Sequence, residues 1–137
     1  MSVVDTAWLR MDSADNLMVI NGLLMFDEPM SYADFKEILE DRLIRQHKRF
    51  RQRPVQIGNQ YLWEELPQVG MEYHLSALEG MQEGCNEVEI RAAVSRQIPA
   101  PLDADKPLWR FFFVPKYKDG TAVMVKVHHS YADGIAL

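Results

Sequence analysis

The chain has 137 residues, of which 47% are hydrophobic, and its formal net charge is −5. This length suits one domain with one core, and the acidic balance argues against a nucleic-acid binder, whose contact surface is normally basic. Cys85 is the single cysteine, so an intrachain disulfide is excluded and a cytoplasmic location, where thiols stay reduced, is expected.

Two elements are predicted in the first third of the chain. Residues 17–26 form an apolar run that indicates one buried strand, or two short ones, ended by the turn residues 27–29. The run is far shorter than the ~20 residues of a membrane-spanning helix, so any membrane association should be peripheral. Ser31 resembles a helix N-cap, and apolar residues then recur at helical spacing, which predicts a helix over residues 31–47.

A basic cluster follows this helix in an otherwise acidic chain. One interpretation is a solvated helix end whose cations complement the helix dipole. The other is a patch for phosphates, either of a coenzyme or of anionic lipid headgroups. The cluster consists of Arg42, Arg45, His47, Lys48, Arg49, Arg51 and Arg53.

The middle of the chain gives weaker signals. Pro54 interrupts the pattern, and residues 61–66 read as a short strand after a Gly-Asn turn. His74 lies between apolar neighbours without a second ligand at a useful spacing, so a packed structural histidine is expected. Asn86 with Glu89 predicts the start of a second helix that ends at Pro99, followed by an extended segment over residues 99–107.

The clearest element is a β-hairpin at the end of the chain. Residues 108–117 and 121–128 are rich in aromatic and β-branched residues and flank Lys118-Asp119-Gly120. Pro115 indicates an edge position or a bulge. If the second strand persists through both histidines, His128 and His129 point to opposite sides and cannot ligate one metal. No other ligand spacing completes a zinc or iron site, so no metal is expected.

The residues after the hairpin carry the usable chemistry. A histidine titrates near neutral pH, so a general base is available. Asp133 lies four residues after His129, where it could orient an imidazole or anchor the turn through an arginine. Gly134 permits a close substrate approach. A Ser130 nucleophile is discounted, because neighbours on an extended segment point apart and no nucleophile elbow surrounds it. The structural alternative is a buried histidine that binds a turn carbonyl and an aspartate that caps a helix.

His128-His129-Ser130-Tyr131-Ala132-Asp133-Gly134 resembles the active-site motif of the coenzyme A-dependent acyltransferases, a superfamily that includes chloramphenicol acetyltransferase and the condensation domains of peptide synthetases. Further stretches are similar to the bacterial wax ester synthase/diacylglycerol acyltransferases. The Pro-Leu-Trp sequence upstream of the histidines and three amino-terminal blocks carry this second resemblance, namely residues 101–103, 106–110, 5–11, 16–27 and 49–53.

The resemblance implies a fold and a reaction. The fold would be an α/β (α+β) half-domain like that of chloramphenicol acetyltransferase, with a mixed or mainly antiparallel sheet, two main helices and the hairpin leading into the motif. His129 would take the proton of a long-chain alcohol or diacylglycerol, whose oxygen attacks acyl-coenzyme A directly. Asp133 would be structural, and His128 and Gly134 would shape the site. Pro107, Leu108 and Trp109 would line the substrate pocket, with hairpin packing as the alternative. No bound cofactor is expected, and acyl-coenzyme A is the co-substrate.

Members of that family are similar to two such halves packed together. Residues 1–137 are therefore expected to be a single amino-terminal half-domain whose partner is the carboxy-terminal half. The inner face of a membrane or a lipid-droplet surface is a further candidate partner. Two alternatives stay open. One is a condensation-type or small-alcohol acyltransferase of the same superfamily, and the other is a non-catalytic, lipid-associated fragment.

Overall fold

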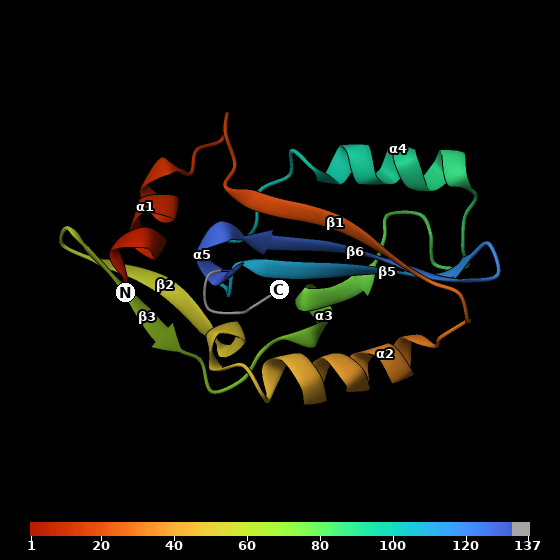
Figure 1. Ribbon diagram of the computed structural model, residues 1–137, viewed down its shortest axis with the longest axis horizontal. Coiled ribbons are helices and arrows are strands. Elements are labelled where there is room, and N and C mark those ends of the chain that lie inside the picture. The colour runs from red at the N-terminus through yellow and green to blue at the C-terminus, as the bar shows by residue number, and fades with distance from the viewer. Residues whose placement is uncertain (133–137) are drawn as a thin grey trace.

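The computed structural model describes residues 1–132, and its centre is a four-stranded mixed sheet (Figure 1). The strands lie in the order β1 (Val19–Phe26), β6 (Gly120–His128), β5 (Trp109–Tyr117) and β4 (Leu75–Ala77). β4 runs parallel to β5, and the other neighbours are antiparallel. The predicted α+β fold with a mainly antiparallel sheet is confirmed.

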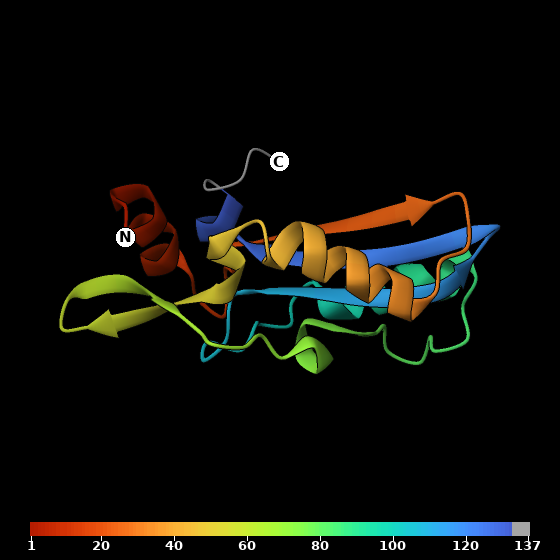
Figure 2. The ribbon, with the colours of Figure 1, turned by 90° about the horizontal axis from the view of Figure 1, so that it is seen from below.

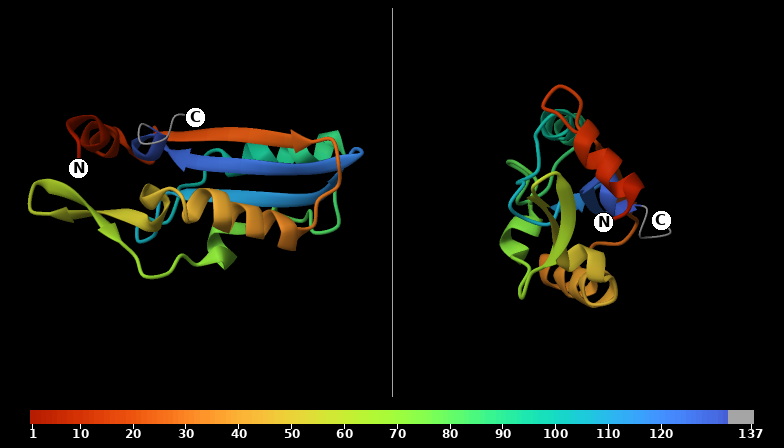
Figure 3. Two further views of the ribbon diagram at one scale, coloured as in Figure 1. Left: turned by 60° about the horizontal axis from the view of Figure 1, so that its bottom comes forward. Right: turned by 90° about the vertical axis from the view of Figure 1, so that its left-hand side faces the viewer.

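Two helices cover opposite faces of this sheet, as the left view of Figure 3 shows. α2 (Tyr32–Ile38) continues as the π-helical turn η1 (Leu39–Ile44), and α4 (Glu87–Gln97) lies behind the sheet. Both predicted caps are present, because Ser31 accepts a hydrogen bond from the third helical amide and Asn86 forms a reciprocal capping box with Glu89. The odd-numbered valines of β6 face α2, and Met124 faces α4.

The hairpin of β5 and β6 forms as predicted, with a bulge beside Pro115 where the strand register shifts. Its two-residue turn is Lys118-Asp119, and Lys118 has φ 54°. Gly120 therefore belongs to β6 rather than to the turn. A Cβ atom on Gly120 would lie 1.6 Å from the carbonyl oxygen of Phe26, so the close approach of the end of β1 requires glycine here.

A second, two-stranded sheet projects from one end of the molecule. It consists of β2 (Gln52–Ile57) and β3 (Gln60–Glu65), and Pro54 pairs with Trp63 inside it. The expectation that Pro54 ends the pattern was wrong, because a strand of a two-stranded ribbon has an open edge where a missing N–H is tolerated.

Short helices complete the same end of the molecule, where α1 (Val3–Met11) and α5 (His129–Ala132) lie together (Figure 1, Figure 2). Arg10 of α1 donates a hydrogen bond to the carbonyl of Asn59 at the tip of the ribbon. The remaining short elements are η2 (Lys48–Arg51) and α3 (Met71–His74). Within residues 1–132, no helix combines the length and apolar character needed to cross a membrane.

Ion pairs engage much of the basic cluster. Arg51 donates to the carbonyls of Ile44 and Arg45, so its charge lies at the carboxyl end of the helix, as the first interpretation predicts. Four arginines also have carboxylate partners, in the pairs Arg45–Asp41, Arg49–Asp5, Arg51–Glu65 and Arg53–Glu64. These contacts favour a structural role for the cluster over a phosphate site.

Candidate active site

The two adjacent histidines have different surroundings because β6 ends at His128 and α5 begins at His129. The expectation that the two side chains point to opposite sides of the sheet assumed that both residues lie on the strand. Because the strand ends at His128, that assumption does not hold. His128 is buried, with 2% of its side chain exposed. His129 is partly exposed and stacks on Trp8 of α1, with ring centroids 4.4 Å apart and an interplanar angle of 20°. Of the two, only His129 is accessible.

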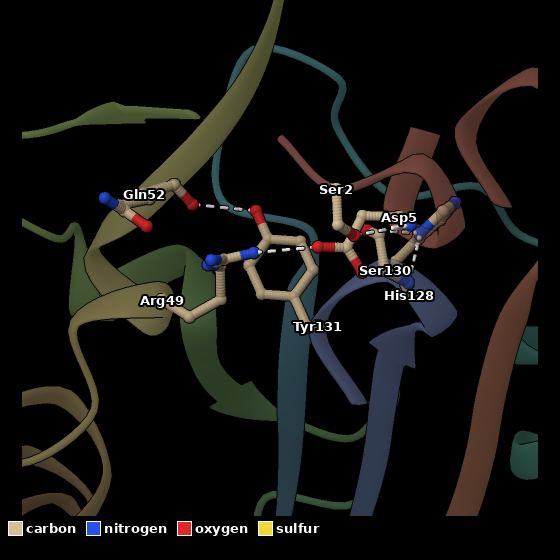
Figure 4. Close-up of polar contacts among 7 residues, drawn as sticks. All are labelled: Ser2, Asp5, Arg49, Gln52, His128, Ser130 and Tyr131. Atoms are coloured by element: carbon tan, nitrogen blue, oxygen red, sulfur yellow. Dashed lines mark hydrogen bonds and ion pairs between the residues drawn. The ribbon is translucent and has the colours of Figure 1, made fainter. Parts of the chain in front are cut away.

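The contacts of His128 fix its protonation. The backbone N–H of Ser130 donates to Nδ1 over 3.1 Å, and Ser130 Oγ lies 2.8 Å from the same nitrogen (Figure 4). Because a backbone amide can only donate, Nδ1 carries no proton and neutral His128 has its hydrogen on Nε2. Burial lowers the pKa of His128, which Asp12 opposes, so the neutral form is favoured. Ser130 is itself fully buried, which gives no support to a serine nucleophile.

The connection between α1 and β1 contacts both histidines. Asp12 Oδ2 lies 3.7 Å from His128 Nε2, and Asp12 Oδ1 accepts a hydrogen bond from the N–H of Met18 over 2.7 Å. The carbonyl of Met18 accepts the N–H of His129 over 2.8 Å. One short segment therefore sets the position of the whole His-His pair. Sequence reasoning missed Asp12, because no local pattern marks a contact with residues at the other end of the chain.

Tyr131 anchors α5 to the rest of the domain. Its hydroxyl donates to the carbonyl of Gln52 over 2.7 Å (Figure 4). The same hydroxyl accepts the N–H of Leu108 over 2.9 Å. The ring is fully buried and packs edge-on against Trp63 and Phe50. Burial raises the pKa of Tyr131, so the hydroxyl keeps its proton and can donate as well as accept.

A partly buried ion pair lies beside Tyr131 and holds α1 in place. Asp5 Oδ2 is 3.2 Å from the guanidinium of Arg49 (Figure 4). The same guanidinium stacks over the ring of Trp63 at 4.0 Å. Ser2 caps α1 by accepting the N–H of Asp5. Arg49 was grouped with a basic surface cluster in the sequence, whereas here it links α1 to η2.

The Pro-Leu-Trp stretch divides between core and cavity. Pro107 and Leu108 are buried, and Leu108 lines a cavity together with His128. Trp109 is fully buried in the core, where its indole N–H donates to the carbonyl of Phe50 and its ring stacks on His74 at 4.2 Å. This position matches the packing alternative for Trp109. Asp133 and Gly134 lie outside the described residues, so their predicted roles stay predictions.

His74 is the packed histidine that the sequence indicates. Its Nδ1 donates to the carbonyl of Trp109 over 2.8 Å, and burial lowers its pKa to about 4. The imidazole is therefore neutral at physiological pH. Within residues 1–132, no group of three or more His, Cys, Asp or Glu side chains is arranged to hold a metal ion.

Two cavities approach the histidine end of β6. The first, of about 510 Å³, is lined by His128, Asp12 and Leu108 together with residues of β2 and the 101–105 segment. The second, of about 290 Å³, exposes only apolar atoms and is bounded by β1, β6 and α5, including Tyr131 and Ala132. The first cavity thus reaches the end of β6 at His128, and the second lies against α5.

Curated relatives match part of this chain. A Mycobacterium tuberculosis H37Rv protein named as a diacylglycerol O-acyltransferase is 36% identical over 76 residues, which is 55% of this chain and 16% of that protein. A second protein of that strain with the same description is 34% identical over 97 residues, or 65% of this chain and 19% of its own length. The chain thus spans less than a fifth of these relatives.

Solved structures share the fold. The wax ester synthase/diacylglycerol acyltransferase from Marinobacter aquaeolei VT8 superposes with a TM-score of 0.68 at 24% identity, covering 97% of this chain and 35% of that one. The epimerization domain from the third module of tyrocidine synthetase B gives a TM-score of 0.71 at 13% identity, covering 94% and 28%. The family model of the wax ester synthase/diacylglycerol acyltransferase catalytic domain matches residues 1–137, and the chain therefore belongs to that family.

Proposed function

We propose that this chain is the amino-terminal half of an O-acyltransferase that transfers a long-chain acyl group from acyl-coenzyme A to a fatty alcohol or diacylglycerol. The observation that carries the proposal is the placement of His129 at the start of α5, where its backbone N–H is bound by the carbonyl of Met18 and its partly exposed imidazole stacks on Trp8. A general base needs such access together with a fixed orientation. Family membership supplies the reaction class.

In this mechanism His129 removes the proton of the acceptor hydroxyl while the hydroxyl oxygen attacks the thioester carbonyl. The carbon–sulfur bond then breaks, and the proton held by His129 passes to the departing thiolate. The reaction needs no acyl-enzyme intermediate and no bound cofactor. The apolar cavity beside Tyr131 and Ala132 has the chemical character that an acyl chain requires.

The remaining parts of the site would come from the carboxy-terminal half. Because the chain spans 16% and 19% of two curated relatives, the family enzyme has ample further sequence to supply oxyanion donors and substrate walls. In this proposal Asp133 holds the turn, and His128 and Gly134 shape the site. Peripheral contact with a membrane or lipid droplet would give access to both lipid substrates.

The test uses the whole enzyme with a long-chain acyl-coenzyme A and a fatty alcohol, and measures release of the coenzyme A thiol. We expect His129→Ala to lower kcat/KM by at least ~10²-fold, the usual contribution of a general base. His47→Ala, at a partly exposed histidine between η1 and η2 whose ring packs against Phe50, serves as the matched control and should leave turnover unchanged.

Unchanged turnover in His129→Ala would refute the assignment of the base. Dependence on a carrier protein, or preference for short acyl chains, would instead identify a condensation-type or small-alcohol enzyme. Lipid binding without turnover in the unaltered protein would identify a non-catalytic module.

A further inference from the structure

The indole of Trp8 holds the ring of His129. The carbonyl of Met18 binds the backbone N–H of His129, but this bond leaves the side chain free to turn about its own torsions. Within residues 1–132, neither ring nitrogen of His129 takes part in a hydrogen bond or an ion pair. The indole instead lies nearly flat against the imidazole, with ring centroids 4.4 Å apart and an interplanar angle of 20°. Because a stack uses the face of the ring, it restricts rotation without occupying the nitrogens at the edge.

Polar contacts hold the helix that carries Trp8. In α1, Asp5 pairs with Arg49 over 3.2 Å (Figure 4), and Arg10 donates to the carbonyl of Asn59 over 2.8 Å. Asp5 is the buried residue of this helix, whereas three of its apolar side chains are exposed, namely Val3, Val4 and Met11. This is the reverse of the pattern expected for a surface helix, whose apolar residues normally face the core. The two polar contacts therefore do much to fix α1 where Trp8 meets the start of α5.

The stack also suits the charge that His129 acquires in the proposed reaction. The imidazole becomes a cation when it takes the proton of the acceptor hydroxyl, and it stays charged until that proton passes to the departing thiolate. In the part of the chain that the structure describes, no carboxylate forms an ion pair with this ring. The face of an indole carries partial negative charge and attracts a cation placed over it, more strongly than a phenyl ring does. Trp8 therefore stabilises the charged form of His129 more than the neutral form.

We propose that Trp8 is a positioning residue of the acyl-transfer reaction, which orients the imidazole of His129 and stabilises its cation while the proton is held. This inference rests on the proposed role of His129 as the base. It gives the site an electrostatic part that comes from α1, at the opposite end of the chain from the histidines. Because the stabilisation exists only while His129 is charged, it speeds the chemical step and leaves substrate binding unchanged.

Fluorinated tryptophans test the electrostatic part while the side chain keeps nearly the same shape. Fluorine withdraws electrons from the indole face, so analogues with an increasing number of fluorine atoms are placed at position 8 alone in the whole enzyme. Release of the coenzyme A thiol is measured with a long-chain acyl-coenzyme A and a fatty alcohol. We expect kcat to fall stepwise, by about three- to tenfold along the series, and KM to stay within about twofold. Equal kcat along the series, or a change confined to KM, would overturn the proposal.

Two substitutions separate the aromatic face from its bulk. Trp8→Phe keeps an aromatic ring, Trp8→Leu keeps only apolar volume, and both lack the indole N–H. We expect kcat to fall about tenfold or more in Trp8→Leu and no more than about threefold in Trp8→Phe. Val4→Ala shortens an exposed side chain of the same helix, and as the matched control it should keep the original kcat. Equal losses in the two Trp8 variants would mean that Trp8 only fills space, and the proposal would be wrong.

Proton NMR of the whole protein tests the stack apart from the chemistry. The ring current of Trp8 should shift the ring protons of His129 upfield, and these resonances are identified by their loss in His129→Ala. They should move downfield in Trp8→Leu, and unchanged positions would overturn the proposal because the two rings would not be in contact. Full turnover in His129→Ala would refute the base and the role of Trp8 together. Lost turnover in His129→Ala with the original kcat in Trp8→Leu would refute the role of Trp8 alone.

Discussion

Replacing Tyr131 with phenylalanine tests how α5 is held. The change deletes one hydroxyl and leaves the ring that packs on Trp63 and Phe50. It removes the acceptor of the Leu108 N–H and the donor to the Gln52 carbonyl. Each buried polar group that loses its partner costs about 1–3 kcal/mol. Two groups lose a partner here, but the Gln52 carbonyl is the more solvent-accessible of them and should cost less than the Leu108 N–H. We therefore expect the free energy of unfolding to fall by about 2–4 kcal/mol.

Urea unfolding of the whole protein measures this loss, and amide hydrogen exchange locates it. The N–H of Leu108 should exchange faster in Tyr131→Phe, because its acceptor is gone. Tyr117→Phe is the matched control, since Tyr117 is also a buried ring on the sheet and its hydroxyl makes no hydrogen bond within residues 1–132. If both variants lose the same stability and Leu108 exchanges at its original rate, the hydroxyl does not bridge the two segments.

Two further predictions concern the core. The pKa of His74 is about 4 in the folded protein and 6.5 in the unfolded chain, so the unfolded chain binds the proton first as the pH falls. The contribution of neutral His74 to the free energy of unfolding is therefore complete above pH 6.5, and about 3 kcal/mol of it is lost as the pH drops toward 4. Unfolding of the unaltered protein and of His74→Gln across this pH range should show a smaller pH dependence in the variant. Gly120→Ala forces a Cβ against the Phe26 carbonyl, so the free energy of unfolding should fall by about 3 kcal/mol or more and the melting temperature should fall with it. Gly22→Ala is the control, because a Cβ there meets nothing within 4 Å and the melting temperature should change little. Equal effects of the two substitutions would contradict the close approach of Phe26 to Gly120.

Elements with strong local signals were predicted correctly. The caps at Ser31 and Asn86 and the β5–β6 hairpin depend on neighbours in the sequence, and all three form. Pro54 was misjudged because a proline signals an interruption only where its N–H would be needed. The helix α1 went unpredicted, although Ser2 caps it.

The candidate site was predictable only in part. The motif and its family resemblance identified His128 and His129, but their different burial follows from where β6 ends. The partners that orient them, Asp12 and Met18, approach from the opposite end of the chain and leave no local pattern. The same holds for Tyr131, whose hydroxyl binds two backbone groups that only the tertiary fold brings together.

The strand order constrains how the molecule assembles. β1 is synthesised first, yet its neighbour in the sheet is β6, and their register pairs Val19 with His128. Until β6 emerges, the apolar residues of β1 have no partner strand, and such long-range pairing is slow. The bond from His129 to Met18 extends the same ladder by one step. Closing the sheet and ordering the histidines are therefore one event, and a nascent chain that stops before β6 has neither.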